Sequence, residues 1–289
     1  MGPLLVIVGE TGSGKSALAM ELAKTFNGEI ISADSWAVYK HFDIGTAKPT
    51  AEEQAEVPHH LIDVADPRVG FSAAEFQRLA FAAIDDISAR GKLPILVGGT
   101  GLYVDCVIYN YSFLPPGDPK QRELLNEMSL QELIEKADAL ELDTTGIDMR
   151  NKRRIIRLIE NNGVRPSREE LRPHTVLLGV QRPLEELRER LVQRMDVMVA
   201  AGFAGEVYRL GEAFGWGCEP MQAPNYRTFA KYINRHLSLS KAKEQCIQND
   251  LQLAKKQRTW FKRNKGIHWL STEDKTARAV ELVTTFLDK

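Results

Sequence analysis

Short apolar runs alternate with amphipathic segments over the first hundred residues of the chain. The runs are Leu4–Val8, Glu29–Ala33 and Leu93–Val97. Between the last two, residues 72–90 carry apolar side chains at helical spacing, and Ser72 with Glu75 forms a capping-box pattern at the start. Buried strands that alternate with helices predict a parallel sheet covered by helices on both faces.

A fourth apolar run, Thr175–Val180, follows the third only after about 75 residues, which is longer than an ordinary crossover. The intervening segment opens with Pro-Pro-Gly-Asp-Pro and is helical in pattern. We therefore expect a mainly helical insertion over 114–173, within a core made of 1–113 and 174–289. Beyond Val180 the pattern is helical over 183–201, over 241–264 and again from Thr272.

The segment Gly-Glu-Thr-Gly-Ser-Gly-Lys-Ser directly follows the first apolar run and matches the phosphate-loop pattern GxxxxGK[ST] in full. Glycines let backbone N–H groups turn toward a phosphate, and the following helix adds its positive N-terminal dipole. Lys15 is expected to reach the terminal phosphate, and Ser16 to ligate Mg²⁺. The fold class predicted is α/β, a phosphate-loop kinase-like parallel sheet. The phosphate-binding residues predicted are Gly9, Glu10, Thr11, Gly12, Ser13, Gly14, Lys15 and Ser16.

A carboxylate is expected beside such a loop at the end of a second apolar strand, but in this sequence it follows a different strand. The most apolar strand ends in Gly98-Gly99-Thr100 and carries no carboxylate, whereas the strand around Ile31 ends at Asp34. Because parallel strands finish at one edge of the sheet, Asp34 and Thr100 are expected to point into one crevice. Asp34 could hold metal or accept a proton there. It could instead cap a helix N-terminus.

Composition narrows the class of protein. Of 289 residues, 43% are hydrophobic and 27% charged, which is typical of a globular protein. Three isolated cysteines lack zinc-site spacing and are compatible with a reducing cytosol. No apolar run reaches the roughly 18–20 residues that span a bilayer, and the first residues do not resemble a signal peptide. We expect a cytoplasmic monomer without a membrane partner.

Besides the phosphate loop, six segments follow one another in a recognisable order: Asp34–Tyr39, Asp43–Pro49, Pro58–Asp63, Val97–Tyr103, Asn151–Arg157 and Ala254–Phe261. In this order they resemble the tRNA dimethylallyltransferase family, and the resemblance covers residues 4 to about 270. The resemblance implies transfer of a dimethylallyl group from dimethylallyl diphosphate to N6 of the adenosine 3′ of the anticodon. The loop would then hold the diphosphate of the donor, with Mg²⁺ as cofactor.

The resemblance also implies roles for particular residues. Asp34 is the expected base, with Thr100 on the target nucleotide and Lys15 on the leaving group. The target base must leave the stack of the anticodon stem-loop. Trp36, Tyr39 and Tyr103 are candidates to line its passage, although core packing is an equal alternative for each. His59 and His60 could touch phosphate but suit a structural role better.

Two basic clusters indicate where RNA could bind. One lies near the end of the insertion, and the other, on the last long helical segment, is interleaved with Trp260 and Phe261. A solvated helix face is the alternative for either cluster. The tRNA-binding residues predicted are Asp34, Ser35, Trp36, Ala37, Thr100, Arg122, Arg153, Arg154, Ile155, Ile156, Arg157, Lys255, Lys256 and Arg258. A further group, Arg182, Arg188, Arg190 and Arg194, could close over the diphosphate.

Two segments depart from the family pattern. The family usually has Gln where this chain has Ala37, and its Ile-Gly-Tyr-Lys-Glu element is replaced around residues 224–229. Three alternatives therefore stay open. They are an ATP-binding small-molecule or nucleotide kinase on the same core, a catalytically weakened RNA-binding relative, and a prenyltransferase for free adenine nucleotides.

Overall fold

The computed structural model describes residues 1–115, 117–271 and 274–288. Its contacts divide the chain into two compact units. The first comprises Met1–Ile108 together with Leu171–Lys289, and the second is Tyr109–Glu170. Each unit has its own hydrophobic core, so each is considered separately.

The first unit is built on a six-stranded parallel sheet with the order β3-β2-β4-β1-β5-β6. The expected α/β class with a parallel sheet is therefore confirmed. Four strands coincide with the apolar runs, whereas the two edge strands are too short for a run to reveal them. The strands are β1 (Leu4–Gly9), β2 (Gly28–Ser32), β3 (His59–His60), β4 (Leu93–Gly98), β5 (Thr175–Val180) and β6 (Ile267–Leu270).

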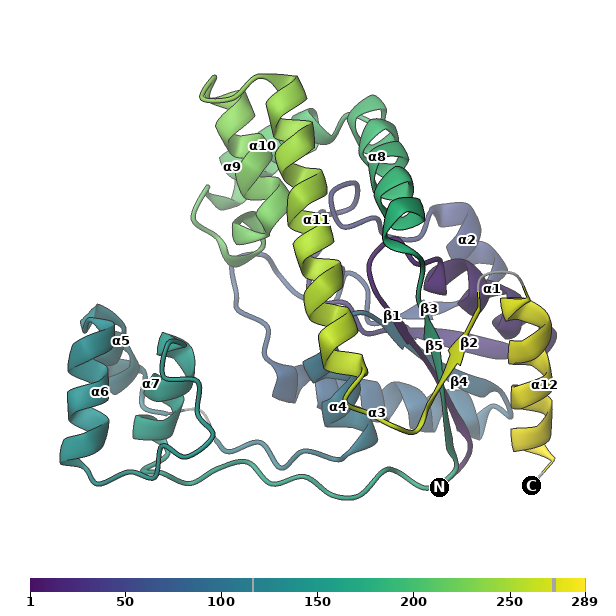
Figure 1. The fold of residues 1–289 in the computed structure, drawn as a ribbon, viewed down its shortest axis with the longest axis horizontal. Helices are drawn as coiled ribbons and strands as arrows, with labels where there is room; N and C mark the ends of the chain where they lie inside the picture. Colours follow the sequence, from purple (N-terminus) through teal and green to yellow (C-terminus); the bar gives the residue numbers. More distant parts are fainter. Residues whose placement is uncertain (116, 272–273, 289) are drawn as a thin grey trace. The chain divides into compact units, whose positions relative to one another are not determined.

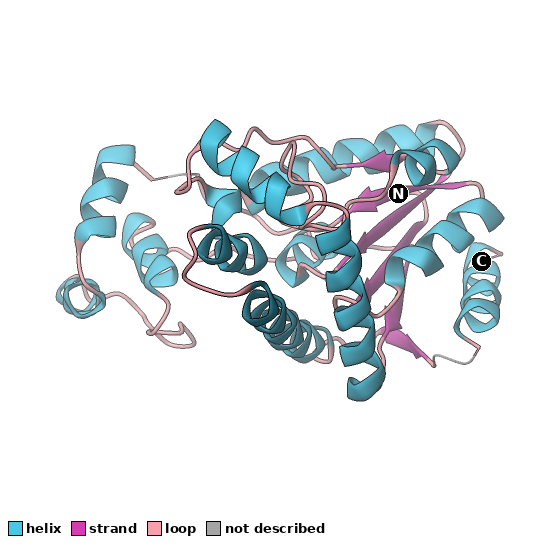
Figure 2. Ribbon diagram, turned by 90° about the horizontal axis from the view of Figure 1, so that it is seen from above, coloured by secondary structure: helices cyan, strands magenta, loops and turns pink. Residues whose placement is uncertain are grey.

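Helices cover both faces of this sheet (Figures 1 and 2). Leu18 and Leu22 of α1 and Val283 of α12 pack on one face, and α3 contacts β2 and β4 on the other. The helices of this unit are α1 (Lys15–Thr25), α2 (Ala51–Glu56), α3 (Ala73–Ala89), α4 (Gly101–Ile108), α8 (Leu184–Ala200), α9 (Phe203–Phe214), α10 (Pro224–Ile233), α11 (Leu239–Phe261) and α12 (Lys275–Leu287), with a 3₁₀ turn over Glu219–Gln222. The capping box of Ser72 and Glu75 starts α3 as predicted. Thr272, the expected start of the last helix, lies outside the described residues.

The helices α8 to α11 lie beside one another at the end of the sheet where the phosphate loop emerges. In Figure 1 the long helix α11 runs past α10 and α8 toward α4, and these helices are in contact with it. The basic C-terminal half of α11 is thus brought close to the loop that follows β1.

The second unit is mainly helical, as expected for the insertion. It contains α5 (Pro119–Glu127), α6 (Leu130–Ala139) and α7 (Lys152–Glu160). The apolar face of α7 buries Ile155, Ile156 and Ile159 against Leu125 and Leu133 of the other two helices.

A buried carboxylate stabilises the edge of the sheet away from the phosphate loop. Glu29 in β2 has a side chain that is only 3% exposed. It accepts hydrogen bonds from both terminal nitrogens of Arg90, from Lys92 Nζ at 2.8 Å and from His60 Nε2 at 2.7 Å. The Arg90 guanidinium holds the pKa of Glu29 well below its usual range, with help from Lys92 and His60. His60 therefore has the structural role that seemed more suitable for it.

We expect Glu29→Gln to destabilise the folded state by about 1–3 kcal/mol at pH 7, because Arg90, Lys92 and His60 lose the carboxylate that binds them. A depressed pKa in the folded state means that this stabilisation is present above the unfolded-state pKa of about 4.3 and is lost as the pH falls further. Urea unfolding at pH 7 and at pH 3 tests this, since the difference between variant and wild type should shrink in acid. Asp86→Asn, which removes only the exposed partner of Arg90, is the control and should cost less than about 1 kcal/mol.

Candidate functional site

The phosphate loop connects β1 to α1, and its glycines are required by its geometry. Gly12 and Gly14 have φ angles of +78° and +92°, which glycine adopts without strain. A Cβ atom on Gly9 would lie 2.4 Å from the carbonyl oxygen of Val180. Side chains at these three positions would therefore change the course of the loop.

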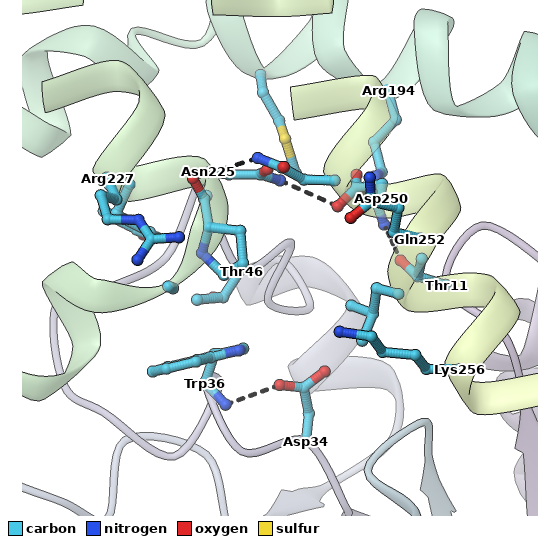
Figure 3. A pocket seen from close by; sticks show the side chains of 17 residues that line it. Thr11, Asp34, Trp36, Thr46, Arg194, Asn225, Arg227, Asp250, Gln252 and Lys256 are labelled. Atoms are coloured by element: carbon cyan, nitrogen blue, oxygen red, sulfur yellow. Dashed lines mark hydrogen bonds and ion pairs between the residues drawn. The ribbon is translucent and has the colours of Figure 1, made fainter. Parts of the chain in front are cut away.

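Two cavities meet beside this loop. We call the first the loop cavity: it has a volume of about 330 Å³ and is lined by Lys15, Ser16, the ends of β2 and β4, and residues 46–49. The second, the helix cavity, has a volume of about 400 Å³ and is lined by Trp36 and by residues of α8, α10 and α11 (Figure 3). The lining residues common to both cavities are Thr11, Asp34, Thr46 and Arg194.

Asp34 thus lies where the two cavities adjoin. Its Oδ1 accepts hydrogen bonds from the backbone N–H groups of Trp36, at 2.8 Å, and Ala37, at 3.2 Å. Among the described residues Oδ2 has no hydrogen-bond partner. One oxygen therefore caps a turn, which was the structural alternative, while the other remains available as a proton acceptor.

Thr100 supports the turn that carries Asp34. Its Oγ1 accepts a hydrogen bond from Ser35 N at 3.1 Å, and its own N–H donates to Ala33 O at 3.3 Å. The described residues that line the two cavities do not include Thr100. Adjacent strands β2 and β4 therefore bring Asp34 and Thr100 together, but only Asp34 lines the cavities, so the expectation that both point into one crevice is not met.

Lys15 is partly buried in the loop, with Nζ 3.4 Å from Glu10 O. Burial lowers the pKa of Lys15 to about 8; nearby Arg194 contributes to this decrease, while Asp34 and Glu10 oppose it. The lysine ammonium thus lies in the same electrostatic environment as the carboxylate of Asp34 and the guanidinium of Arg194. An anion bound in the loop cavity would favour the charged form of Lys15.

Arginines of α8 and of the segment before it contact three successive residues of the loop. Arg182 donates to Ser13 O at 2.9 Å, and Arg190 donates to Gly12 O at 3.0 Å. Arg194 donates to Thr11 Oγ1 at 2.9 Å. Arg188, the fourth member of the predicted group, lines a separate depression together with Glu185 and Glu189.

The helix α11 also contacts the phosphate loop directly. Arg258 donates to both carboxylate oxygens of the buried Glu10, at 2.7 and 2.6 Å, and Gln257 Oε1 accepts from Thr11 N at 2.8 Å. Arg258 was expected among the tRNA-binding residues, yet here its guanidinium binds the loop. Gln257 was not among the predicted site residues, although it lies within the family-like segment Ala254–Phe261.

The aromatic residues that were candidates to line the passage of the base lie in two different environments. Trp36 lines the helix cavity, whereas Tyr39 and Tyr103 are only 2% and 5% exposed and belong to the core. On α11, Phe261 is buried as well. Trp260 is partly exposed, and its Nε1 donates to Asp105 Oδ2 at 2.9 Å.

The basic residues predicted to contact RNA are either exposed or bound to buried carboxylates. Lys255 and Lys256 are exposed on α11, where they line an open depression of about 550 Å³ with Trp260 and Arg263.

In the second unit Arg153 and Arg154 are exposed, while Arg122 and Arg157 bind the buried carboxylate of Glu160. The side chains of Ile155 and Ile156 lie in the core of that unit and so do not reach its surface. Ala37 is buried and lines the loop cavity.

The described residues contain no group of three or more His, Cys, Asp or Glu side chains that could hold a metal ion. In the same part of the chain no helix is long and apolar enough to cross a membrane.

A parallel sheet with a phosphate loop after its first strand, and a carboxylate where two cavities meet, define a phosphate-loop protein built for group transfer. Comparison with known sequences specifies the family. The sequence model described as "IPP transferase" matches residues 37–264, and the chain belongs to this family.

Individual relatives agree with this assignment over nearly the whole chain. A curated tRNA dimethylallyltransferase of Anoxybacillus flavithermus is 40% identical over 284 residues, which cover 94% of this chain and 91% of that protein. The solved tRNA isopentenylpyrophosphate transferase of Bacillus halodurans is 35% identical with a TM-score of 0.77, covering 100% of this chain and 97% of the other. A eukaryotic dimethylallyltransferase solved acting on tRNA is 26% identical with a TM-score of 0.82, covering 100% of this chain and 80% of the other.

The lowered pKa of Lys15 predicts a pH dependence for binding of inorganic pyrophosphate. A bound anion favours the ammonium form, so affinity should be full below about pH 8 and fall as the pH rises above it. Calorimetric titrations between pH 6.5 and 9.5 measure this dependence. Lys15→Arg keeps its charge throughout, so the ratio of wild-type to variant affinity should decline above pH 8; a constant ratio would contradict the assignment.

Proposed function

We propose that the protein is a tRNA dimethylallyltransferase. It transfers the dimethylallyl group of dimethylallyl diphosphate to N6 of the adenosine that lies 3′ of the anticodon. The observation that carries this proposal is the meeting of the loop cavity and the helix cavity at Asp34. A donor diphosphate on the phosphate loop and a base entering from the helix cavity would reach one carboxylate from two sides.

The donor half of the site suits a leaving diphosphate. Negative charge accumulates on the diphosphate as the allylic C–O bond breaks, and Lys15 with the backbone amides of the loop stabilises that charge. Arg182, Arg190 and Arg194 already contact the loop and can turn toward the same anion. Mg²⁺ is the cofactor that we propose, since the Ser16 hydroxyl lines the cavity, and when bound it would further neutralise the diphosphate.

The acceptor half of the site suits an adenine amino group. This nitrogen is a weak nucleophile because its lone pair is conjugated with the ring. As its new bond to the allylic carbon forms and the C–O bond breaks, one N6 proton passes to Asp34 Oδ2. Ser35 and Thr100 hold the turn that carries Asp34, through the hydrogen bonds of the Thr100 hydroxyl with the Ser35 backbone N–H and hydroxyl.

The base must first leave the anticodon loop, which costs a few kcal/mol of unstacking. The indole of Trp36, on the wall of the helix cavity, offers a stacking surface for the extruded adenine. Lys255 and Lys256 lie on the exposed face of the neighbouring helix, where they would bind the RNA backbone. We assign Arg153 and Arg154 of the second unit to the same RNA, and we propose that the protein acts as a cytoplasmic monomer.

Incubation with labelled dimethylallyl diphosphate and unmodified tRNA, followed by nucleoside analysis, tests the proposal. The expected product is labelled N6-dimethylallyladenosine with release of one diphosphate per transfer. A parallel reaction with ATP and candidate small molecules tests the kinase alternative. Consumption of ATP without any labelled nucleoside would overturn the proposed function, and labelling of free adenine nucleotides but not of tRNA would redirect it.

Asp34→Asn should lower the rate of transfer by about 10²–10⁴-fold, because it removes the proton acceptor. Asparagine keeps an Oδ1 atom for the N–H groups of Trp36 and Ala37, so the turn should persist. Tight binding of tRNA by this variant, measured by filter binding, should remain within twofold of wild type. Ser35→Ala is the matched control and should retain most activity; transfer by Asp34→Asn at the wild-type rate would exclude Asp34 as the base.

Replacing Lys255 and Lys256 by Gln should weaken tRNA binding and reduce its salt dependence. Two lost phosphate contacts to single-stranded RNA correspond to a decrease of roughly 1.4 in the slope of log K against log salt concentration. Fluorescence titrations between 50 and 200 mM salt give these slopes. Affinity that depends on phosphate contacts changes strongly over this range of salt concentration. Lys241 and Lys243, near the other end of α11, are the control pair, and an unchanged slope in the first variant would move the RNA site elsewhere.

A further inference from the structure

One irregular segment forms a wall of both cavities. Residues 43–49, which we call the roof segment, supply Gly45 and Thr46 to the helix cavity and residues 46–49 to the loop cavity. Thr46 is one of the four residues shared by the two cavities, together with Asp34. The position of the roof segment therefore affects the space in which a donor and an acceptor would meet.

The first half of the roof segment is held by a buried carboxylate from a distant part of the chain. Glu206 of α9 is only 3% exposed. Its Oε2 accepts from the backbone N–H groups of Asp43, at 3.1 Å, and Ile44, at 2.8 Å. Its Oε1 accepts from Gly45 N at 3.0 Å and from the hydroxyl of Tyr226 at 2.6 Å. Four donors thus converge on one side chain.

Packing beneath Gly45 leaves no freedom for the segment to move toward α9 and α10. A Cβ atom on Gly45 would lie 2.3 Å from Phe203 and 2.5 Å from Tyr226. These two rings form an edge-to-face pair with centroids 5.1 Å apart. The Glu206 carboxylate therefore holds the backbone of residues 43–45 against the rings of Phe203 and Tyr226, which limit how closely this backbone can approach α9 and α10.

The second half of the roof segment is held by Lys48, which also binds the side chain of Asp43. The Nζ of Lys48 donates to Tyr39 O at 2.6 Å, to Asp43 Oδ1 at 2.8 Å and to Asp63 Oδ1 at 2.6 Å. Thr46 lies between the two attachments, and its hydroxyl donates to Phe42 O at 2.5 Å. Loss of the Glu206 attachment would leave Lys48 in place, so the change would be greatest at residues 43–46.

We propose that Glu206 is a positioning residue for the transfer reaction: through Asp43, Ile44 and Gly45 it sets the place of Thr46 at the junction of the two cavities. This inference rests on the proposed function. Burying a carboxylate is costly, and an apolar residue would suffice merely to fill the space beneath a loop. Three of the four hydrogen bonds to this carboxylate come from backbone N–H groups and so specify where the backbone lies, which matters where two reactants must approach each other.

Glu206→Gln tests the proposal, because it keeps Oε1 and replaces the acceptor used by Asp43 and Ile44 with a donor. A displacement near 1 Å at a reacting site can cost on the order of 10²-fold in rate, so we expect kcat to fall by about 10–100-fold. The KM for dimethylallyl diphosphate and the Kd for tRNA should each change less than about fivefold. Amide hydrogen exchange in a peptide spanning residues 42–49 should become faster, a readout that does not depend on activity.

Two control variants separate positioning from loss of stability. Tyr226→Phe removes one of the four donors to Glu206 and should lower kcat by only about threefold. If Glu206→Gln does not fold, this smaller decrease in kcat tests the positioning role instead, and wild-type kcat in Tyr226→Phe would then contradict it. Val283→Ala destabilises the buried contact of α12 with the sheet, remote from the roof segment, and should leave kcat unchanged below its Tm.

Wild-type kcat in Glu206→Gln, or unchanged exchange at residues 42–49, would overturn the inference. Wild-type protein that fails to prenylate tRNA would instead overturn the proposed function, while the exchange measurement would still report on the attachment itself.

Discussion

The buried carboxylate of Glu10 joins the phosphate loop to the elements that complete the site. It receives two hydrogen bonds from Arg258 of α11 and one, at 3.2 Å, from the backbone N–H of Arg182, directly after β5. A carboxylate that is only 2% exposed is tolerated because these donors satisfy it. The interaction anchors α11 beside the loop, and so the lysines of that helix and the wall of the helix cavity take their places relative to the loop. The same anchoring explains why Gln257 can accept from Thr11 N.

The two interpretations of Asp34, as a turn cap and as a base, turn out to be compatible. A carboxylate has two oxygens, and the backbone N–H groups of Trp36 and Ala37 engage only one of them. This attachment fixes the direction of the second oxygen, which supports its proposed role as proton acceptor at the meeting of the cavities. Glu206 is likewise a carboxylate that holds backbone, and both of its oxygens accept from N–H groups of the roof segment.

Basic residues illustrate why charge in a sequence does not translate directly into a nucleic-acid surface. Arg258 and Lys255 are three residues apart on one helix, yet the first binds buried Glu10 and the second is exposed. In the second unit Arg154 is exposed while Arg157 binds Glu160. A local pattern reports that a helix is basic, but the partner of each cation lies elsewhere in the chain and is brought close only by folding.

The sequence by itself determined the four long strands, the phosphate loop, the α/β class, the helical insertion and the family, because all of these depend on local periodicity and on motifs of a few adjacent residues. Tertiary structure alone decided the edge strands β3 and β6, which are too short to produce an apolar run. It also separated Arg188 from the arginines at the loop, buried Tyr39 and Tyr103, and brought Glu206 to the roof segment and Gln257 to Thr11. Such contacts join residues that are 160 or more positions apart, so their energy depends on packing and on burial, neither of which a local pattern contains.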